Sequence, residues 1–202
     1  MKHTDNSIIF IHIPKTAGFT IGKCLRKNGS LKNGYGFSHK IARNIIKPEH
    51  KNCIVMCVVR NPYDRLYSIY EFYRKKRNDI NVDVTFEDFI LNFEKDYYLK
   101  KPQFDTCYNF ISDKTGKIMA TDIIKFENLN LEYDNFCKKY NIVNNLIKDN
   151  VNELKNNNIC FDTLYSTEMQ TIVNKIFQKD FEFFDYNYSQ FINSKIQKFK
   201  NK

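Results

Sequence analysis

A short segment between a strand-like run and a helix-like pattern holds residues that could bind a phosphate. Residues 13–20, IPKTAGFT, combine small residues, hydroxyl groups and Lys15 just before a helix N-terminus. Exposed backbone N–H groups and the positive end of the helix dipole attract an anion, and Gly18 permits a close backbone approach. The Lys15 ammonium adds a mobile charge. The segment is typical of a phosphate cradle without the Walker pattern; an ordinary turn with a solvent-facing lysine is the alternative.

A second loop, residues 59–68, again places a cation at the end of a strand. Arg60 precedes Asn61, a good N-cap whose following proline suits the first helical position. Asn61, Arg65 and Ser68 would then share one helix face, since nearly two turns separate the first from the last. Arg60 and Ser68 are placed to hold one phosphate between them. The alternative is that Arg60 pairs with a carboxylate and Ser68 is a buried helix hydroxyl.

Two apolar, β-branched runs supply the strands that would position these loops. Residues 7–13 end at Pro14, and residues 53–59 end at Arg60. Each pattern is typical of a strand buried on both faces, and a helical period follows each loop. Strand, loop and helix in this order predict an α/β fold with a P-loop-like parallel sheet flanked by helices. Ligands of such sheets bind at the carboxyl ends of the strands.

The rest of the chain predicts helices and one turn. The helices follow from apolar residues at helical spacing, and the turn from a polar Gly-containing tetrad. The expected elements are a short helix at 39–46, helices over 85–93, 129–140 and 167–181, the last with a capping box of Thr167 and Gln170, and a hairpin turn at 113–116 before 118–126. Because no repeat or linker interrupts the chain, we expect a single domain over residues 1–202.

Composition narrows the class of protein. The chain of 202 residues is 42% hydrophobic and 15% aromatic with a mean hydropathy of -0.56, which excludes a membrane bundle and a disordered chain. No apolar run approaches the roughly 20 residues that a membrane span needs. No secretory leader is evident, so we expect a cytoplasmic protein. In that compartment the cysteines are expected to be free thiols. The net charge of +9 favours an anionic partner. Without a CxxC motif and with four histidines, we expect no metal site.

Together the two loops resemble the cofactor signatures of sulfotransferases that use 3′-phosphoadenosine-5′-phosphosulfate (PAPS). FIHIPKTAG at 10–18 and VVRNPYDRLYSIY at 58–70 are similar to the carbohydrate branch, which includes the heparan 2-O- and chondroitin sulfotransferases and their small bacterial and viral relatives. PQF at 102–104, IIKFENL at 123–129 and the segment 165–186 are also similar to that branch. The resemblance covers nearly the whole chain.

The resemblance implies roles for the matching residues. Lys15 would contact the phosphosulfate, while Arg60 and Ser68 would hold the 3′-phosphate. Backbone and hydroxyl groups around the 5′-phosphate would come from Thr16, Ala17, Gly18, Phe19 and Thr20. Phe19 stands where relatives often carry a small or hydroxyl residue, so there we expect the backbone cradle without a side-chain hydrogen bond. His12, inside the strand, is expected to be structural.

The implied reaction is in-line transfer of a sulfuryl group to an acceptor hydroxyl, expected on a glycan, with no metal required. A general base must take the acceptor's proton, and a neutral imidazole suits that task. His39 is our candidate because it lies between the two loops, where related sulfotransferases also carry histidine. Glu71 is the second candidate. An exposed histidine at a helix start is the alternative for His39.

Three other functions stay open at this stage. One is a homologue that binds PAPS without turnover, and another is an atypical nucleotide kinase, which would need magnesium. The third is a basic nucleic-acid-binding protein, supported by the charge and by the lysine-rich segments 74–77 and 195–202. Such segments are usually solvated faces, so we expect no nucleic-acid partner. The sequence predicts neither the oligomeric state nor the identity of the acceptor.

Overall fold

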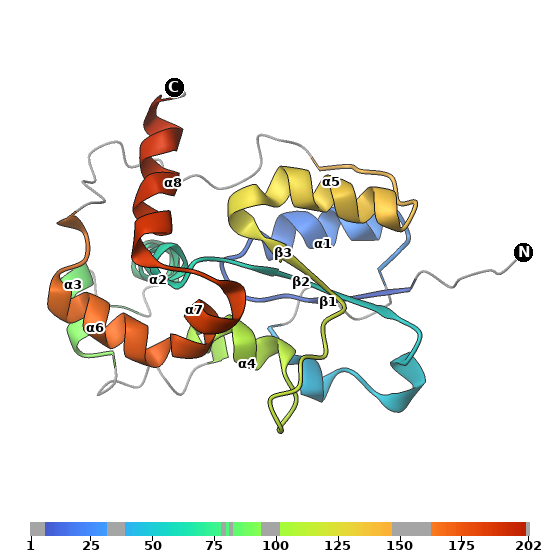
Figure 1. Ribbon diagram of the computed structural model, residues 1–202, viewed down its shortest axis with the longest axis horizontal. Coiled ribbons are helices and arrows are strands. Elements are labelled where there is room, and N and C mark those ends of the chain that lie inside the picture. Colours follow the sequence, from blue (N-terminus) through green and yellow to red (C-terminus); the bar gives the residue numbers. More distant parts are fainter. Residues whose placement is uncertain are drawn as a thin grey trace, which may run out of the picture. The chain divides into compact units, whose positions relative to one another are not determined.

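Figure 1 shows the computed structural model, which describes residues 7–31, 39–77, 80, 83–93, 102–146 and 163–200. The chain folds into two compact units. The first comprises residues 1–60 and 107–152, and the second comprises residues 61–106 and 153–202. The single domain over residues 1–202 stays a prediction.

A three-stranded parallel sheet is the framework of the first unit. Its strands, in the order β1-β2-β3, are β1 (Ile8–Ile11), β2 (Ile54–Val59) and β3 (Asp122–Lys125). The register pairs Ile11 with Cys57 and Val59 with Lys125. Because all strands run the same way, the loops after β1 and β2 leave from the same edge of the sheet. The predicted α/β class with a P-loop-like parallel sheet is confirmed.

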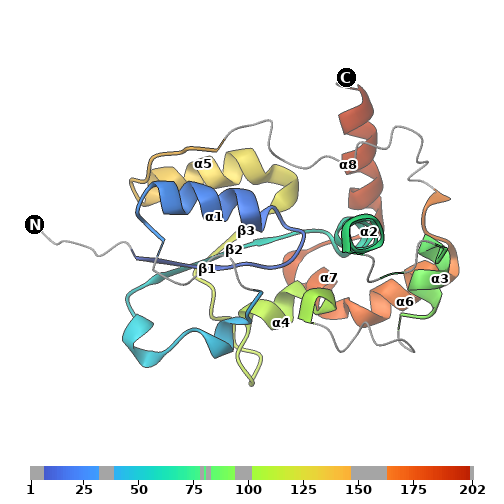
Figure 2. The same cartoon turned by 180° about the vertical axis from the view of Figure 1, so that it is seen from behind.

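Helices flank this sheet on both faces. The helices α1 (Gly18–Lys27) and α5 (Leu129–Lys139) lie side by side on one face, and α4 (Cys107–Ile111) lies on the other (Figures 1 and 2). Alternate strand residues such as Phe10 and Met56 point to the α1 and α5 face, where they share a buried cluster with Leu25 and Tyr133. Burial of this apolar layer holds the two helices against the strands.

The opposite face of the sheet carries Cys57, which lies close to Cys107 of α4. Burial, with smaller contributions from Cys107 and Asp122, raises the pKa of the Cys57 thiol well above its ordinary value. Cys24, Cys57 and Cys137 are buried as thiols, in agreement with the sequence prediction. A buried thiol with a raised pKa is a poor nucleophile, so these residues act as small apolar core residues.

The second unit is helical and rich in aromatic side chains. Its helices are α2 (Pro62–Phe72), a π-helical turn at Tyr73–Arg77, α3 (Phe86–Leu91), α6 (Thr167–Ile176), α7 (Gln178–Phe184) and α8 (Tyr188–Lys200). Tyr63 of α2, Phe89 of α3 and Phe191 of α8 belong to one buried cluster. The hydroxyl of Tyr165 donates to the carbonyl oxygen of Tyr63 at 2.7 Å, which satisfies a polar group inside that cluster.

Several predicted elements need correction. Ser166, rather than Thr167, caps α6, because the Ser166 hydroxyl accepts a hydrogen bond from the Met169 N–H. The helix predicted over 167–181 is broken at Phe177, which ends α6 and precedes α7. The short helix expected at 39–46 is a 3₁₀ turn at Ala42–Asn44. Further 3₁₀ turns are Pro48–His50, Pro102–Phe104 and Phe126–Asn128.

The predicted hairpin at 113–116 is present only as a turn with a single bridge. Ser112 and Ile118 form one isolated antiparallel bridge, and β3 then pairs with β2 in parallel. The Asp113 carboxylate accepts hydrogen bonds from the N–H groups of Thr115 and Lys117 at 2.8 and 3.0 Å. The turn is therefore held by its own aspartate rather than by a strand pair. Among the described residues, no helix has the length and apolar character of a membrane span.

Candidate active site

The loop after β1 is bent by two residues in the left-handed region. Lys15 has a φ of 65° and Ala17 a φ of 63°, conformations that are unusual for side chains other than glycine. Thr16 lies between them, fully buried, and its hydroxyl donates to the carbonyl oxygen of Ile13 at 2.9 Å. Backbone N–H groups in a turn of this kind form a concavity that binds anions. Because the Thr16 hydroxyl holds the loop together, it is the backbone of Thr16 that suits an anion.

The N-terminus of α1 follows this loop without a side-chain cap. Ala17 is the N-cap residue and has no side chain that could accept a hydrogen bond, and the first turn of α1, which the structure describes in full, contains no acidic residue. Arg26 and Lys27 occupy the last turn, where they complement the helix dipole. A helix that begins in this way offers N–H groups and a positive dipole end to an external anion.

A neighbouring side chain requires glycine at position 18. A Cβ atom at Gly18 would lie 1.9 Å from Cδ2 and 2.3 Å from Nε2 of His12. The sequence suggested that Gly18 permits a close approach of the anion. That role stays a prediction, and the structure shows in addition that the absence of a side chain at position 18 makes room for the imidazole of His12.

Arg60 connects the end of β2 to the same loop. Its Nη1 donates to the carbonyl oxygen of Lys15 at 2.9 Å, and its Cζ lies 4.1 Å from the centre of the Phe126 ring, just after β3. The side chain is 4% exposed. The guanidinium therefore joins the carboxyl ends of the three strands.

His39 lies beside the start of the loop. Its Nδ1 is 3.2 Å from the carbonyl oxygen of His12, and the two imidazole rings are 4.5 Å apart at an angle of 59°. The side chain of His39 is exposed. The structure thus brings the candidate base together with the loop that contains Lys15, within the first unit.

The remaining predicted residues belong to the second unit. Asn61 caps α2 as expected, since its side-chain oxygen accepts from the Tyr63 N–H at 3.1 Å. Arg65 is buried and donates to the carbonyl oxygens of Asp105 and Gln103 at 2.7 and 3.1 Å, so it fixes the segment that contains the PQF motif. Ser68 lies on α2 and is half-buried. The joint grip of Arg60 and Ser68 on one phosphate stays a prediction.

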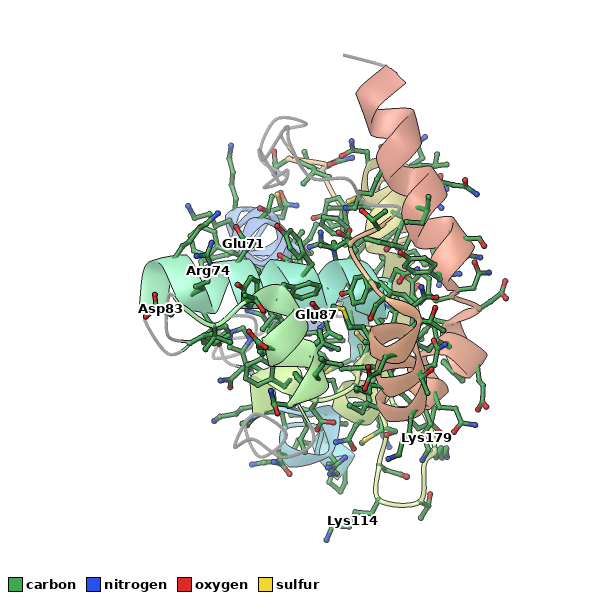
Figure 3. All side chains as sticks on the ribbon, turned by 90° about the vertical axis from the view of Figure 1, so that its left-hand side faces the viewer. Glu71, Arg74, Asp83, Glu87, Lys114 and Lys179 are labelled. Atoms are coloured by element: carbon green, nitrogen blue, oxygen red, sulfur yellow. The ribbon has the colours of Figure 1, made fainter. Side chains whose placement is uncertain are left out.

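Glu71, the second candidate base, is already bound by two cations. Figure 3 shows Glu71 and Arg74 on the same helical segment. An Arg74 nitrogen lies 3.3 Å from one carboxylate oxygen of Glu71, and the Lys75 ammonium pairs with the other. The Glu71 carboxylate is therefore part of an ion-pair network with Arg74 and Lys75. The geometry of Glu71 therefore favours a structural role, and His39 stays the first candidate.

Two residues of this site were not assigned to it by the sequence analysis. His12 was expected to be structural, and Phe126 was noted only within the IIKFENL motif. The signal for His12 was a polar ring in an otherwise apolar strand run. Phe126 gave no such signal, because its contact with Arg60 joins segments that are far apart in the chain.

Comparison with known proteins adds a family to this geometry. A family model described as "Sulfotransferase family" matches residues 1–187. No curated protein matches the chain, and no solved structure does. Within the described residues, no three histidine, cysteine, aspartate or glutamate side chains form a cluster that could hold a metal ion.

Proposed function

Because the chain belongs to the sulfotransferase family, we propose that it transfers a sulfuryl group from PAPS to an acceptor hydroxyl, and that the acceptor is a glycan. The observation that supports this proposal most strongly is the loop after β1. There Lys15 precedes an uncapped helix N-terminus, and its carbonyl is fixed by Arg60. The glycan acceptor rests on the resemblance of the two loops to the carbohydrate branch.

The residues of the loop suit a polyanionic donor. PAPS has a phosphosulfate and a 3′-phosphate, and it supplies the sulfuryl group of the reaction. The left-handed turn at Lys15 and Ala17 and the first N–H groups of α1 provide neutral donors, and the Lys15 ammonium provides a charge. Thr16, Gly18, Phe19 and Thr20 would contribute backbone groups to the same cradle.

The proposed chemistry divides between two side chains of the first unit. Lys15 would stabilise the negative charge that develops on the leaving phosphate, which is the kind of preorganised electrostatic stabilisation that contributes most to group transfer. His39 would accept the proton of the attacking hydroxyl. Arg60 and Ser68 would hold the 3′-phosphate, so that the donor is oriented for an in-line attack.

The basic segments that favoured a nucleic-acid partner are partly neutralised within the second unit. Lys195, from the segment 195–202, is buried in an ion pair with Asp64, and Arg74 and Lys75 pair with Glu71. Ion pairing of this kind reduces the positive charge that these side chains offer to a phosphate backbone. The structure therefore gives this alternative less support than the net charge did.

A binding experiment separates the remaining alternatives. The protein should be retained on immobilised adenosine 3′,5′-bisphosphate (PAP) and be released by free PAP in the presence of a magnesium chelator. Retention that requires magnesium and prefers ATP would favour the nucleotide kinase. Salt-sensitive retention on DNA that free PAP does not displace would favour the nucleic-acid-binding protein. Tight PAP binding without sulfuryl transfer to any acceptor would identify an inactive homologue.

A further inference from the structure

Three contacts meet at His12, the residue that directly follows β1. Its ring stacks on Phe10 with the centroids 5.9 Å apart and the planes at 17°. It also lies 4.5 Å from the ring of His39, and its edge fills the space beside the Cα of Gly18. The imidazole of His12 is therefore in contact with the strand, with the candidate base and with the first residue of α1.

The contact with Gly18 fixes the helix start. Two ring atoms of His12 occupy the place where any other residue at position 18 would have its Cβ. Real Cβ atoms do not approach other heavy atoms at 1.9 to 2.3 Å, so a side chain at position 18 and the observed ring position exclude each other. The ring thereby determines how closely the first turn of α1 approaches the end of β1.

The backbone of His12 determines the tautomer of His39. The Nδ1 of His39 lies 3.2 Å from the His12 carbonyl oxygen. A carbonyl oxygen can only accept a hydrogen bond, so Nδ1 must carry the hydrogen. In a neutral imidazole the other nitrogen then holds the lone pair. The nitrogen of His39 that can accept a proton is therefore Nε2.

We propose that His12 is a positioning residue of the transfer site. Its carbonyl holds His39 as the Nδ1–H tautomer. Its ring packs against that imidazole and against the start of α1, and so fixes the position of both relative to the end of β1. In the transfer step, the acceptor oxygen bonds to sulfur as the bond from sulfur to the leaving phosphate oxygen breaks. The acceptor proton passes to Nε2 of His39 and then to water. The use of Nε2 as the base rests on the proposed function, whereas the tautomer and the packing do not.

The first test is the tautomer of His39 in the unmodified protein. Long-range ¹⁵N–¹H spectra, recorded at about pH 8 where an ordinary imidazole is neutral, distinguish the two tautomers by the nitrogen that carries hydrogen. We expect hydrogen on Nδ1. Hydrogen on Nε2, or an equal mixture, would overturn the proposal whether or not the protein transfers sulfuryl groups.

The second test removes the ring of His12. His12→Ala keeps the backbone carbonyl but removes the ring that holds the His39 imidazole against it, so His39 should shift to a mixture of tautomers. Because the base then loses its orientation, kcat should fall about tenfold or more. His12→Phe, which keeps a flat ring, should restore the Nδ1–H signal and part of kcat. His50→Ala, which removes another buried histidine of the first unit, should leave the His39 spectrum unchanged. An unchanged His39 spectrum in His12→Ala would contradict the positioning role.

The third test measures the coupling between positions 12 and 18. Gly18→Ala should lower the midpoint of thermal unfolding in the wild-type background and have a much smaller effect in the His12→Ala background, since the obstructing ring is then absent. Equal shifts in both backgrounds would contradict the contact. This readout needs no activity, so a protein that proves inactive still tests the packing.

Discussion

Arg60 donates a hydrogen bond to the carbonyl oxygen of Lys15 at 2.9 Å, so a buried guanidinium fixes a residue whose φ is 65°. A lysine whose backbone lies in the left-handed region is strained, and this conformation persists only where the surrounding structure holds it. The same guanidinium lies on the Phe126 ring. Arg60 therefore supports the loop after β1 in addition to its predicted role at the 3′-phosphate.

This double role predicts different effects for Arg60→Ala and Ser68→Ala. Ser68→Ala should weaken the binding of PAP about tenfold and leave adenosine 5′-phosphate binding nearly unchanged, because a hydrogen bond to a charged group contributes about 1.5–3 kcal/mol. Arg60→Ala should weaken both ligands, since it also releases the carbonyl of Lys15. Isothermal calorimetry with the two nucleotides measures the difference. Equal losses for both ligands in Ser68→Ala would remove Ser68 from the 3′-phosphate site.

His39 predicts a pH dependence of turnover. If its neutral imidazole takes the acceptor's proton, kcat should rise between about pH 6 and 7 and then level off. His39→Ala should flatten this limb and lower kcat by roughly a hundred to ten thousandfold, while PAP affinity changes by no more than a few fold. Glu71→Gln is the matched comparison at the second candidate. A pH limb that survives in His39→Ala and disappears in Glu71→Gln would reverse the assignment.

The strands and the two loops could be predicted because their signals are local. A β-branched run before Pro14 marks β1, and Asn61 before a proline marks the start of α2. Ser166 and Thr167 are both good caps, so the sequence predicted the α6 cap one residue late. The break at Phe177 is hidden, since apolar residues keep their helical spacing across it.

Contacts between distant segments gave no signal in the sequence. Asp64, in the first turn of α2, pairs with Lys195, at the far end of the chain. Gly18 was assigned to ligand approach, although the ring beside it belongs to His12. In both cases the residue type was informative, but its partner depends on the tertiary fold.

The ion pair of Asp64 and Lys195 predicts a large loss of stability when one partner is removed. Both side chains are buried, so Lys195→Met should leave the Asp64 carboxylate buried without its ion pair to Lys195 and lower the free energy of unfolding by about 3–5 kcal/mol. Asp64→Asn combined with Lys195→Met should recover part of this loss. Urea unfolding measures both variants, with the exposed pair of Asp134 and Lys138 as a control in which Lys138→Met has no measurable effect. A negligible loss in Lys195→Met would show that the pair does not hold α8.

The lowered pKa of Asp122 predicts that part of the protein's stability is lost at acidic pH. Burial raises the pKa of its carboxyl, but hydrogen bonds from Lys139, Tyr140 and Thr121 outweigh burial, so the net shift is downward. A lowered folded-state pKa stabilises the protein above the unfolded value of about 3.9, and this contribution is lost as the pH falls through the folded value. Asp122→Asn should therefore reduce stability at neutral pH and flatten its fall below about pH 5. Urea unfolding across this pH range gives the slope, and an unchanged slope would contradict the assignment.

The transfer of labelled sulfate from PAPS tests the central proposal most directly. The protein is incubated with ³⁵S-labelled PAPS and a panel of glycans, small alcohols and peptides, and both labelled acceptor and PAP are counted. We predict one PAP for each sulfated acceptor, with a glycan preferred. Lys15→Gly, which suits the positive φ, should lower the rate at least about a hundredfold, whereas Lys27→Ala at the other end of α1 should not. Equal rates in the wild type and Lys15→Gly, or no labelled acceptor from any member of the panel, would contradict the account.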